Sequence, residues 1–263
     1  MEGKTHRKIT CEAFKLCRDF LPDIYKYNVD FEREVTQGSY DEDNKGLDRA
    51  LNWHFYRAED SCIPKTYAYI FKTNSREILE KRISELADFS LSTFKRYNTL
   101  GRIIHHVQDM STPSHVLPIY HGPMYQFFKC GKIKDLFEEF IANNQNSITA
   151  DGLTAPKSIH EISNFIEIYD TAATGMLEIL QSGFKFDNTI IPSEHFWKNY
   201  KIKESKHIEG FGAYGDCNHC FTTLDFSLCP DNLRKETLDN IQKTITNHAI
   251  INTCKTILYA TNK

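Results

Sequence analysis

Several classes of protein are excluded by what this sequence lacks. It has no apolar run near the roughly 20 residues that a membrane-spanning helix needs. Its charged start, MEGKTHRKIT, has no apolar signal-peptide core. The 263 residues carry a formal net charge of −3, so no overall basic field attracts nucleic acid. These absences predict a cytosolic protein without a transmembrane segment.

Cysteine is also sparse, since eight residues in 263 are too few for a disulfide scaffold. Cys11 and Cys254 lie in helical patterns and are expected to be small core residues. The stretch from Cys217 to Cys220 includes His219 and has the C-x-x-C spacing of half a zinc ribbon, with Cys229 as a conceivable fourth partner. Loop cysteines that bind nothing are the alternative interpretation.

Strand signals are scarce as well, and the one β-like run is Thr66–Phe71. Helical periodicity dominates instead, with capping-box-like starts at two places. The helices expected are Thr10–Phe20, Asp48–Arg57, and four that begin at Asn74, Gly101, Ser158 and near Asp231. We predict an all-α fold, with residues 1–263 forming a single multi-helix domain and 187–230 an irregular loop or insertion.

The stretch IIHHVQDMSTPSH, residues 103–115, concentrates side chains that bind metals. His105 and Asp109 are four residues apart, so a helix places them on one face, about 5–6 Å apart between Cβ atoms. An imidazole and a carboxylate at this spacing can share one divalent metal ion. Pro113 is expected to end the helix, after which a loop can turn His115 back towards the same pocket.

Other candidate ligands recur along the chain, which favours a metal site over isolated histidines. His106 points to another helical face and is expected to have no function. The further candidates are His6, Asp41 and Asp43 in GSYDEDN, His54 in LNWHFYR, His121 in PIYHG, and Glu138 in DLFEEF.

Together these segments resemble a known family. The pattern LGxxxHxxxDxxxPxH, Leu100–His115, is similar to the core motif of the zinc-dependent phospholipase C family, and P1-type nucleases share its H…D…P.H portion. The segments THRKIT, GSYDED, WHFYR and FEEF resemble flanking elements of that family in the same order, over residues 6–140. The GSYDED element points to Asp43 over Asp41.

The resemblance implies an all-α cleft that holds two or three zinc ions. The first implied site uses Asp43, His54, His105 and Asp109. The second implied site uses His115 with a further histidine and a glutamate. The third implied site uses His6, Asp109 as a bridge, and the amino group of an N-terminal tryptophan.

Two departures from the family pattern affect these assignments. The family often places the second-site histidine four residues before the glutamate, where this chain has Lys134, so His121 is the expected substitute. Residues 125–128, which include Gln126, are a rival alignment for the glutamate element, but a carboxylate binds Zn²⁺ better than an amide, which favours Glu138. The chain also begins with Met1, not tryptophan, so the third site retains His6 and Asp109.

The implied function is a zinc-dependent phosphodiester hydrolase, with phospholipase C-type cleavage of a phospholipid headgroup and transient contact with a membrane surface. A water shared by two zinc ions would be the nucleophile, and Asp43 would be the catalytic residue that orients or deprotonates it. Nucleic acid is the less favoured substrate because lysines and arginines are dispersed among acidic residues. Aromatic residues near the motifs, among them Phe55 and Tyr56, suit a quaternary ammonium headgroup.

Two alternatives stay open. A P1-like nuclease or nucleotidase would use the same metals, although VLPIYHG lacks the glycine-rich GGN continuation of those enzymes. A non-catalytic, metal-stabilised helical interaction module would keep the ligands without the reaction.

Overall fold

The computed structural model describes residues 3–44, 54–56, 75–119, 121, 134–156, 161–199 and 211–262. These residues are mostly helical, which confirms the predicted all-α class. The helices are α1 (Gly3–Cys17), α2 (Asp23–Lys26), α3 (Val29–Asn44), α5 (Ser75–Leu86), α6 (Thr93–Asp109), α7 (Pro113–Val116), α8 (Leu136–Asn143), α9 (Phe165–Ser182), α10 (Cys220–Thr223) and α11 (Lys235–Thr261), with 3-10 turns η1 (Arg18–Phe20), η3 (Gln145–Ser147) and η4 (Ser193–His195). The strands are β1 (Phe184–Phe186), β2 (Thr189–Ile191), β3 (Trp197–Lys198) and β4 (Ala213–Tyr214).

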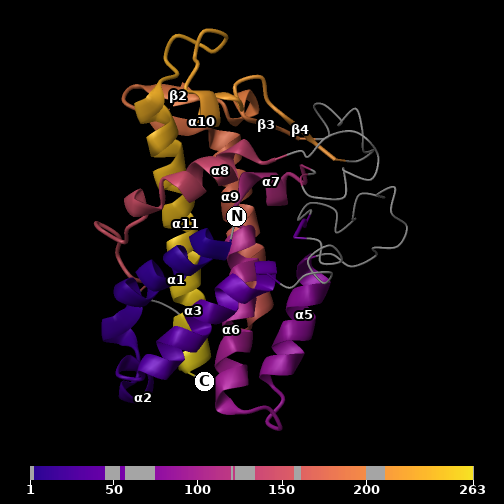
Figure 1. Cartoon of the computed structure of the whole chain (residues 1–263), viewed down its shortest axis with the longest axis vertical. Helices are drawn as coiled ribbons and strands as arrows, with labels where there is room; N and C mark the ends of the chain where they lie inside the picture. The colour runs from indigo at the N-terminus through magenta and orange to yellow at the C-terminus, as the bar shows by residue number, and fades with distance from the viewer. Residues whose placement is uncertain are drawn as a thin grey trace.

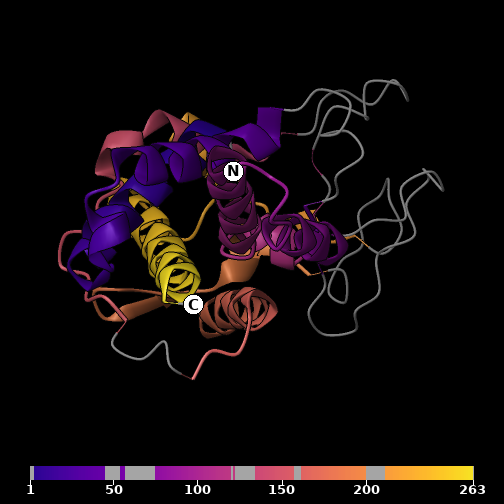
Figure 2. The same cartoon turned by 90° about the horizontal axis from the view of Figure 1, so that it is seen from below.

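The long helices α6, α9 and α11 run lengthwise through the bundle, and the view along the bundle shows them nearly end-on (Figures 1 and 2). α11 buries Leu238, Ile241, Ile245 and Ala249, which recur at helical spacing, against this interior. One connected apolar core joins residues of α1, α3, α6, α8, α9 and α11. None of the described helices combines the length and apolarity that crossing a membrane requires.

Two glycines allow α3 and α6 to cross unusually closely. A Cβ on Gly38 would lie 2.0 Å from the carbonyl oxygen of Asn98, and a Cβ on Gly101 would lie 2.0 Å from that of Val35. Gly101 lies inside α6 and does not begin this helix, contrary to the sequence prediction. The helix begins at Thr93, where the Ser92 hydroxyl accepts a hydrogen bond from a backbone N–H of the first turn. The close crossing brings the end of α3 beside the ligand-bearing part of α6.

Other helix starts differ from the sequence prediction to varying degrees. α5 and α11 begin within one and four residues of their predicted starts. α9 instead begins at Phe165, where Asn164 is the N-cap: its side chain accepts from Glu167 N at 2.9 Å, and the Glu167 carboxylate reaches back to accept from Ser163 N at 2.8 Å. The predicted start at Ser158 lies outside the described residues.

Two predicted elements fall partly or wholly outside the described residues. His54–Tyr56 is not helical, although it was expected to belong to a helix, and the rest of that helix is not described. The predicted strand at Thr66–Phe71 also lies outside the described residues.

The segment expected to be an irregular loop contains short antiparallel strands. β1 pairs with β2, with Phe184 opposite Ile191, and β3 pairs with β4. With α10 these strands gather at one end of the bundle, above α8 in Figure 1. Trp197 and Phe221 are almost fully buried in the common core, so this segment is packed onto the bundle. Tight turns between short strands leave little periodicity in the sequence, which explains why the hairpin was not predicted.

Candidate metal centre

The structure brings all eight candidate ligands predicted from the sequence into one cluster. They come from α1, α3, α6, α7, α8 and the segments around His54 and His121. Groups whose ligand atoms lie within 4.8 Å of one another are His6/His105/Asp109, Asp43/His54/His105, His54/His106/Asp109 and His115/His121/Glu138. These buried groups could hold metal ions.

Asp109 lies at the centre of the cluster. Its Oδ1 is 3.4 Å from Nε2 of His6 and 3.4 Å from Nδ1 of His115, while its Oδ2 is 3.3 Å from Nε2 of His105 and 2.5 Å from Nδ1 of His54. One carboxylate therefore contacts residues of all three sites that the resemblance implies. This position suits a bridging ligand.

His115, His121 and Glu138 form the second part of the cluster. Glu138 Oε1 lies 3.1 Å from Nε2 of His115 and 3.5 Å from Nε2 of His121. The exposed Lys134 instead reaches Glu139, at 3.3 Å, and His121 is the histidine that lies beside Glu138 with His115. The rival Gln126 lies outside the described residues.

Local structure explains how α7 and α8 present these ligands. Pro113 does not simply end the preceding helix: it occupies the first turn of α7, where its missing N–H is tolerated, and His115 follows within that helix. At α8, the Asp135 carboxylate accepts from Phe137 N at 2.9 Å and from Glu138 N at 3.2 Å. This cap fixes the first turn and thereby the direction of Glu138.

Adjacent carboxylates at the end of α3 have different partners. Glu42 is neutralised by Arg82, whose Nη2 lies 2.8 Å from Oε1, and also contacts His106 at 3.3 Å. Asp43 is buried, and its ion-pair partners among the described residues are histidines, with His105 at 3.8 Å and His6 at 3.9 Å. Glu42 is thus compensated by the protein, whereas Asp43 faces the cluster. Asp43 lies on the last turn of α3.

Asp41, the rejected neighbour in the same motif, points elsewhere. Its carboxylate accepts hydrogen bonds from Gln37 at 2.6 Å and from Asn98 at 3.0 Å. The preference for Asp43 over Asp41 therefore agrees with the geometry.

Hydrogen bonds at the outer nitrogens orient three of the histidines. His105 Nδ1 lies 2.9 Å from the Ser39 carbonyl oxygen, and His121 Nδ1 lies 2.8 Å from that of Ile119. A carbonyl oxygen only accepts, so each Nδ1 carries a proton and each Nε2 is the nitrogen that faces the cluster. A metal-binding histidine is held by this kind of outer contact.

His6 is oriented by a longer chain of hydrogen bonds. Gln108 Nε2 donates to the hydroxyls of Thr10 at 2.9 Å and Thr253 at 3.0 Å. Its Oε1 therefore faces His6 Nδ1, at 2.7 Å, and accepts that proton. Sequence reasoning missed Gln108, because nothing near it in the chain reveals partners on α1 and α11.

The protonation states leave a cluster rich in negative charge. Burial opposes ionisation of Asp109, but His105, His115 and His54 outweigh it and hold the pKa of that carboxyl well below its usual range. Burial, helped by His105, lowers the pKa of His6 to about 3, so His6 is neutral. Burial also disfavours the charged form of His105, yet Asp109 and Asp43 raise its pKa to about 9.

A divalent cation therefore fits this environment. His6 Nε2, Asp43 Oδ2, His54 Nε2 and His115 Nδ1 are buried without a hydrogen-bond partner among the described residues. Buried polar atoms of this kind are costly unless something binds them. Imidazole nitrogens and carboxylate oxygens that converge in this way are the donors of transition-metal sites.

Two neighbouring residues differ from their expected roles. His106 is fully buried between Glu42 and the Ser75 hydroxyl, and its ring stacks on that of His54 at 5.7 Å. It therefore borders the site instead of facing away from it. Phe55 is also buried, against the rings of His115 and His121, and forms a wall of the cluster where an exposed rim was expected.

In comparisons with known proteins, no family model matches this chain, and no curated protein is significantly similar to it. The resemblance to zinc-dependent phospholipase C therefore rests on the motifs and on the convergence of their side chains.

Proposed function

We propose that this protein is a zinc-dependent phosphodiester hydrolase of the phospholipase C type. The observation that carries the proposal is the convergence on Asp109 of histidines from α1, α6, α7 and the segment around His54. An ordinary helical core gains nothing from burying so many polar groups together. Metal binding gives this arrangement a favourable free energy.

Zinc is the metal that the donor set fits best. Its ligands would be the imidazole nitrogens and carboxylate oxygens of the clusters around Asp109 and Glu138. Bound zinc ions would supply Lewis acidity, which lowers the pKa of a water molecule and neutralises charge on the oxygens of a phosphodiester.

Asp43 is the residue of this chain that we assign to orient the attacking water. Its Oδ2 is buried beside His6 without a hydrogen-bond partner among the described residues, so it can accept a hydrogen bond from water. Burial alone would raise the pKa of Asp43, but the combined effect of His105, His6 and His54 is larger, so the pKa is lowered. A carboxylate with a low pKa is a weak base, so its contribution is mainly orientation through a hydrogen bond.

Phe55 helps to exclude water from the second part of the cluster. Its ring lies 5.6 Å from that of His115 and 5.2 Å from that of His121, and Phe211 packs on its other side at 5.5 Å. Low local polarity strengthens electrostatic interactions between the ligands and a bound phosphodiester.

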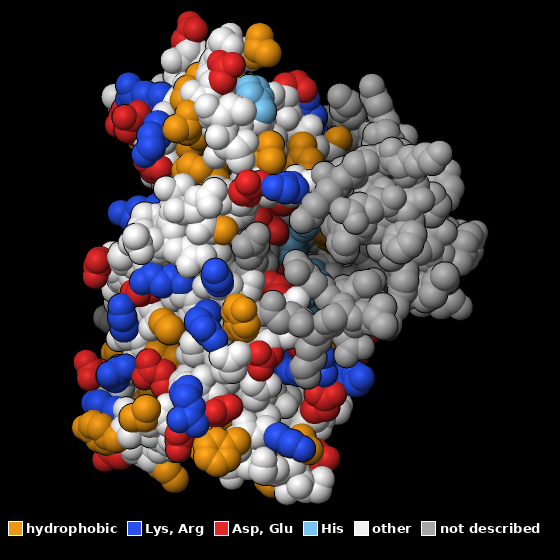
Figure 3. Space-filling view, in the orientation of Figure 1, with side chains coloured by type: hydrophobic (Ala, Val, Ile, Leu, Met, Phe, Trp, Pro, Cys, Tyr) orange, Lys and Arg blue, Asp and Glu red, His pale blue; other side chains and the backbone are white. Residues whose placement is uncertain are grey.

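A lipid-like phosphodiester is the substrate class that the described surface favours. On the face drawn in Figure 3, lysine and arginine side chains alternate with aspartate and glutamate, and histidines lie among acidic side chains near the middle. Binding of single-stranded nucleic acid usually relies on a continuous basic track. We therefore favour a zwitterionic phospholipid headgroup over DNA or RNA.

The test combines metal analysis with parallel assays on short-chain phosphatidylcholine and on a single-stranded oligonucleotide. We expect about two or three equivalents of zinc in this cluster, over and above any zinc bound by cysteine thiolates, and faster release of the phosphorylated headgroup. His105→Ala should abolish hydrolysis, whereas His195→Ala, a half-buried histidine in η4, should not. Less than one equivalent of metal would refute the proposal. Faster release of nucleotides would favour the P1-like alternative, and metal without hydrolysis would favour a non-catalytic module.

A further inference from the structure

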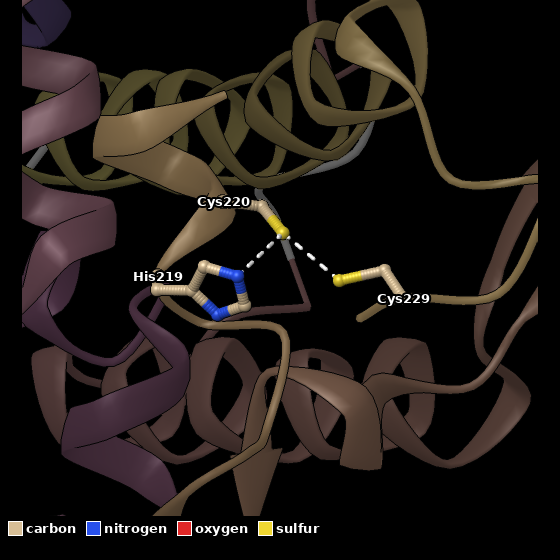
Figure 4. Close-up of side chains that lie close together, drawn as sticks. All are labelled: His219, Cys220 and Cys229. Atoms are coloured by element: carbon tan, nitrogen blue, oxygen red, sulfur yellow. Dashed lines mark hydrogen bonds between the residues drawn. The ribbon is translucent and has the colours of Figure 1, made fainter. Parts of the chain in front are cut away.

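A second group of metal-binding side chains lies outside the centre described above, in the segment packed at the end of the bundle. His219, Cys220 and Cys229 point towards one another, as Figure 4 shows, and their ligand atoms lie within 4.8 Å of one another. None of these residues belongs to the motifs that resemble phospholipase C. We propose that they, together with Cys217, form a structural zinc site.

Of two ligand–ligand distances in this group, one matches a tetrahedral zinc site and the other is shorter than such a site requires. His219 Nε2 lies 3.7 Å from Cys220 Sγ, and Cys220 Sγ lies 2.9 Å from Cys229 Sγ (Figure 4). Zn–N and Zn–S bonds of about 2.0 and 2.3 Å imply roughly 3.6 Å between nitrogen and sulfur ligands and roughly 3.8 Å between two sulfurs. The first distance fits already, and the second requires one thiolate to move by less than an ångström.

His219 has the tautomer that a metal ligand needs. Its Nδ1 lies 2.9 Å from the carbonyl oxygen of Asp216, which only accepts, so Nδ1 carries the proton. The lone pair on Nε2 therefore faces Cys220. This is the same outer contact that orients His105 and His121 in the other cluster.

Cys217 is the proposed fourth donor, and its thiol must move closer, since the group whose ligand atoms all lie within 4.8 Å of one another is His219, Cys220 and Cys229. Its thiol interacts with that of Cys229, and Cys220 N donates to the Cys217 carbonyl oxygen at 3.1 Å, which closes the C-x-x-C turn. Cys217 and Cys220 are almost fully buried, and Cys229 is half-buried. Three thiolates and one imidazole form a soft donor set that selects zinc over magnesium or calcium.

The site has a clear structural purpose. Residues 222–228 are largely exposed, and Leu228 is 82% exposed, so this loop has little apolar anchoring of its own. A zinc ion would tie Cys229 at its far end to Cys217 and Cys220 at its start. Phe221, next to Cys220, packs against Phe137 at 5.0 Å, and Phe137 precedes Glu138 of the other cluster. The zinc site therefore supports the helix that carries Glu138.

Cobalt spectroscopy distinguishes this site from the other one, because only thiolate ligands give the sulfur-to-cobalt charge-transfer band in the near ultraviolet. The fully reduced, metal-free protein is titrated with CoCl₂ and its absorption is recorded. We expect the band to saturate at about one equivalent of thiolate-bound cobalt. Cys220→Ser and Cys229→Ser should lose the band, whereas Cys11→Ser, on α1, and Asp109→Asn should retain it.

Absence of the band in the fully reduced wild-type protein would overturn the proposal, and so would its persistence in both cysteine variants. A Cys220–Cys229 disulfide is the competing state, and a protein that shows no cobalt–thiolate band after reduction would favour it. A thiol-counting reagent gives a second measurement that needs no variant. Added zinc should protect about three thiols from modification, and no protection would refute the site.

Discussion

The two candidate metal sites differ in the local structure that forms them and in the type of ligand that they offer. The cluster around Asp109 is built from five helices and two adjoining segments, and it contains histidines and carboxylates. The cluster around Cys220 is built from short turns and contains thiols with one histidine. In the first cluster, the Asp109 carboxylate contacts several histidines and could bridge metal ions. In the second cluster, all the donors would bind a single ion. Catalytic zinc sites keep a position open for water, and structural sites are filled by the protein.

Acquisition of metal by the two sites should therefore respond differently to pH, and this is the largest effect that we expect. Burial raises the pKa of Cys217 to about 12 and that of Cys229 to about 11, and the pKa of Cys220 is also raised, so metal displaces about three protons. The helical site is the cluster around Asp109. There the pKa of His105, a residue of the first implied site, is raised to about 9, so metal must displace its proton.

Protons compete with metal, so both affinities should rise with pH. Metal affinity should rise about tenfold per pH unit for each proton displaced. Per pH unit, the affinity of the thiol site should therefore rise about a thousandfold and that of the His105 site about tenfold. Cobalt titrations between roughly pH 6.5 and 8 measure the first slope, and calorimetry of Cys220→Ser measures the second. Equal slopes at the two sites would contradict the assigned protonation states.

Asp109→Asn should abolish most of the hydrolytic activity without affecting the cysteine site. An amide cannot bridge cations as a carboxylate does, so we expect hydrolysis to fall by roughly 100-fold or more together with metal content. Asp41→Asn is the matched control, since Asp41 bonds to Gln37 and Asn98 outside the cluster. The cobalt–thiolate band should survive in both variants. Near-normal hydrolysis by Asp109→Asn would show that this carboxylate is not a ligand.

The two sites also differ in how far the sequence predicts them. The four-residue spacing of His105 and Asp109 required only a helix, and the structure places their nearest atoms 3.3 Å apart. His6, His54, His121 and Glu138 were assigned from the resemblance, since no local pattern brings residues from such distant segments together. The C-x-x-C spacing suggested half a metal site, but the approach of Cys229 depends on a tight loop that periodicity does not describe.

The differences between the predicted and observed helix starts have similar physical causes. Ser158/Glu161 and Asn164/Glu167 offer similar capping patterns six residues apart, and α9 begins after Asn164, whose side chain caps it. Gly101 resembles a helix boundary in sequence because glycine disfavours helices. In the structure its missing side chain allows contact with α3 at the Val35 carbonyl, which is a tertiary reason that local propensity cannot contain.

Gln108→Met tests the outer contacts of the helical site. It removes the acceptor that fixes the His6 tautomer while roughly keeping the side-chain volume. Loss of such a contact typically weakens metal binding about 10- to 100-fold. Gln242→Met is the matched control, because Gln242 is a buried glutamine that bonds instead to the Asn144 carbonyl and the Ser147 hydroxyl. Equal metal affinity in the two variants, measured by competition with a chelating dye, would mean that Gln108 has only a packing role.

Gly101→Ala should give the smallest change at the metal and tests whether the close helix crossing positions it. The new Cβ would lie 2.0 Å from the Val35 carbonyl oxygen and 2.8 Å from the Gly38 Cα, so α3 must move away from α6. Overpacking of this kind typically costs about 1–3 kcal/mol, only partly offset by the better helix propensity of alanine. We expect the melting temperature to fall by roughly 2–4 °C for each kcal/mol.

The same shift moves Asp43 on α3 relative to His105 on α6, whose atoms already lie 3.8 Å apart. Metal affinity of the helical site should therefore fall a few-fold, while the cobalt–thiolate band stays unchanged because neither helix contributes to that cluster. Lys95→Ala, on the exposed part of α6, is the control and should change stability by less than about 0.5 kcal/mol. If Gly101→Ala lowers the melting temperature without lowering metal affinity, the crossing stabilises the bundle but does not set the geometry of the site.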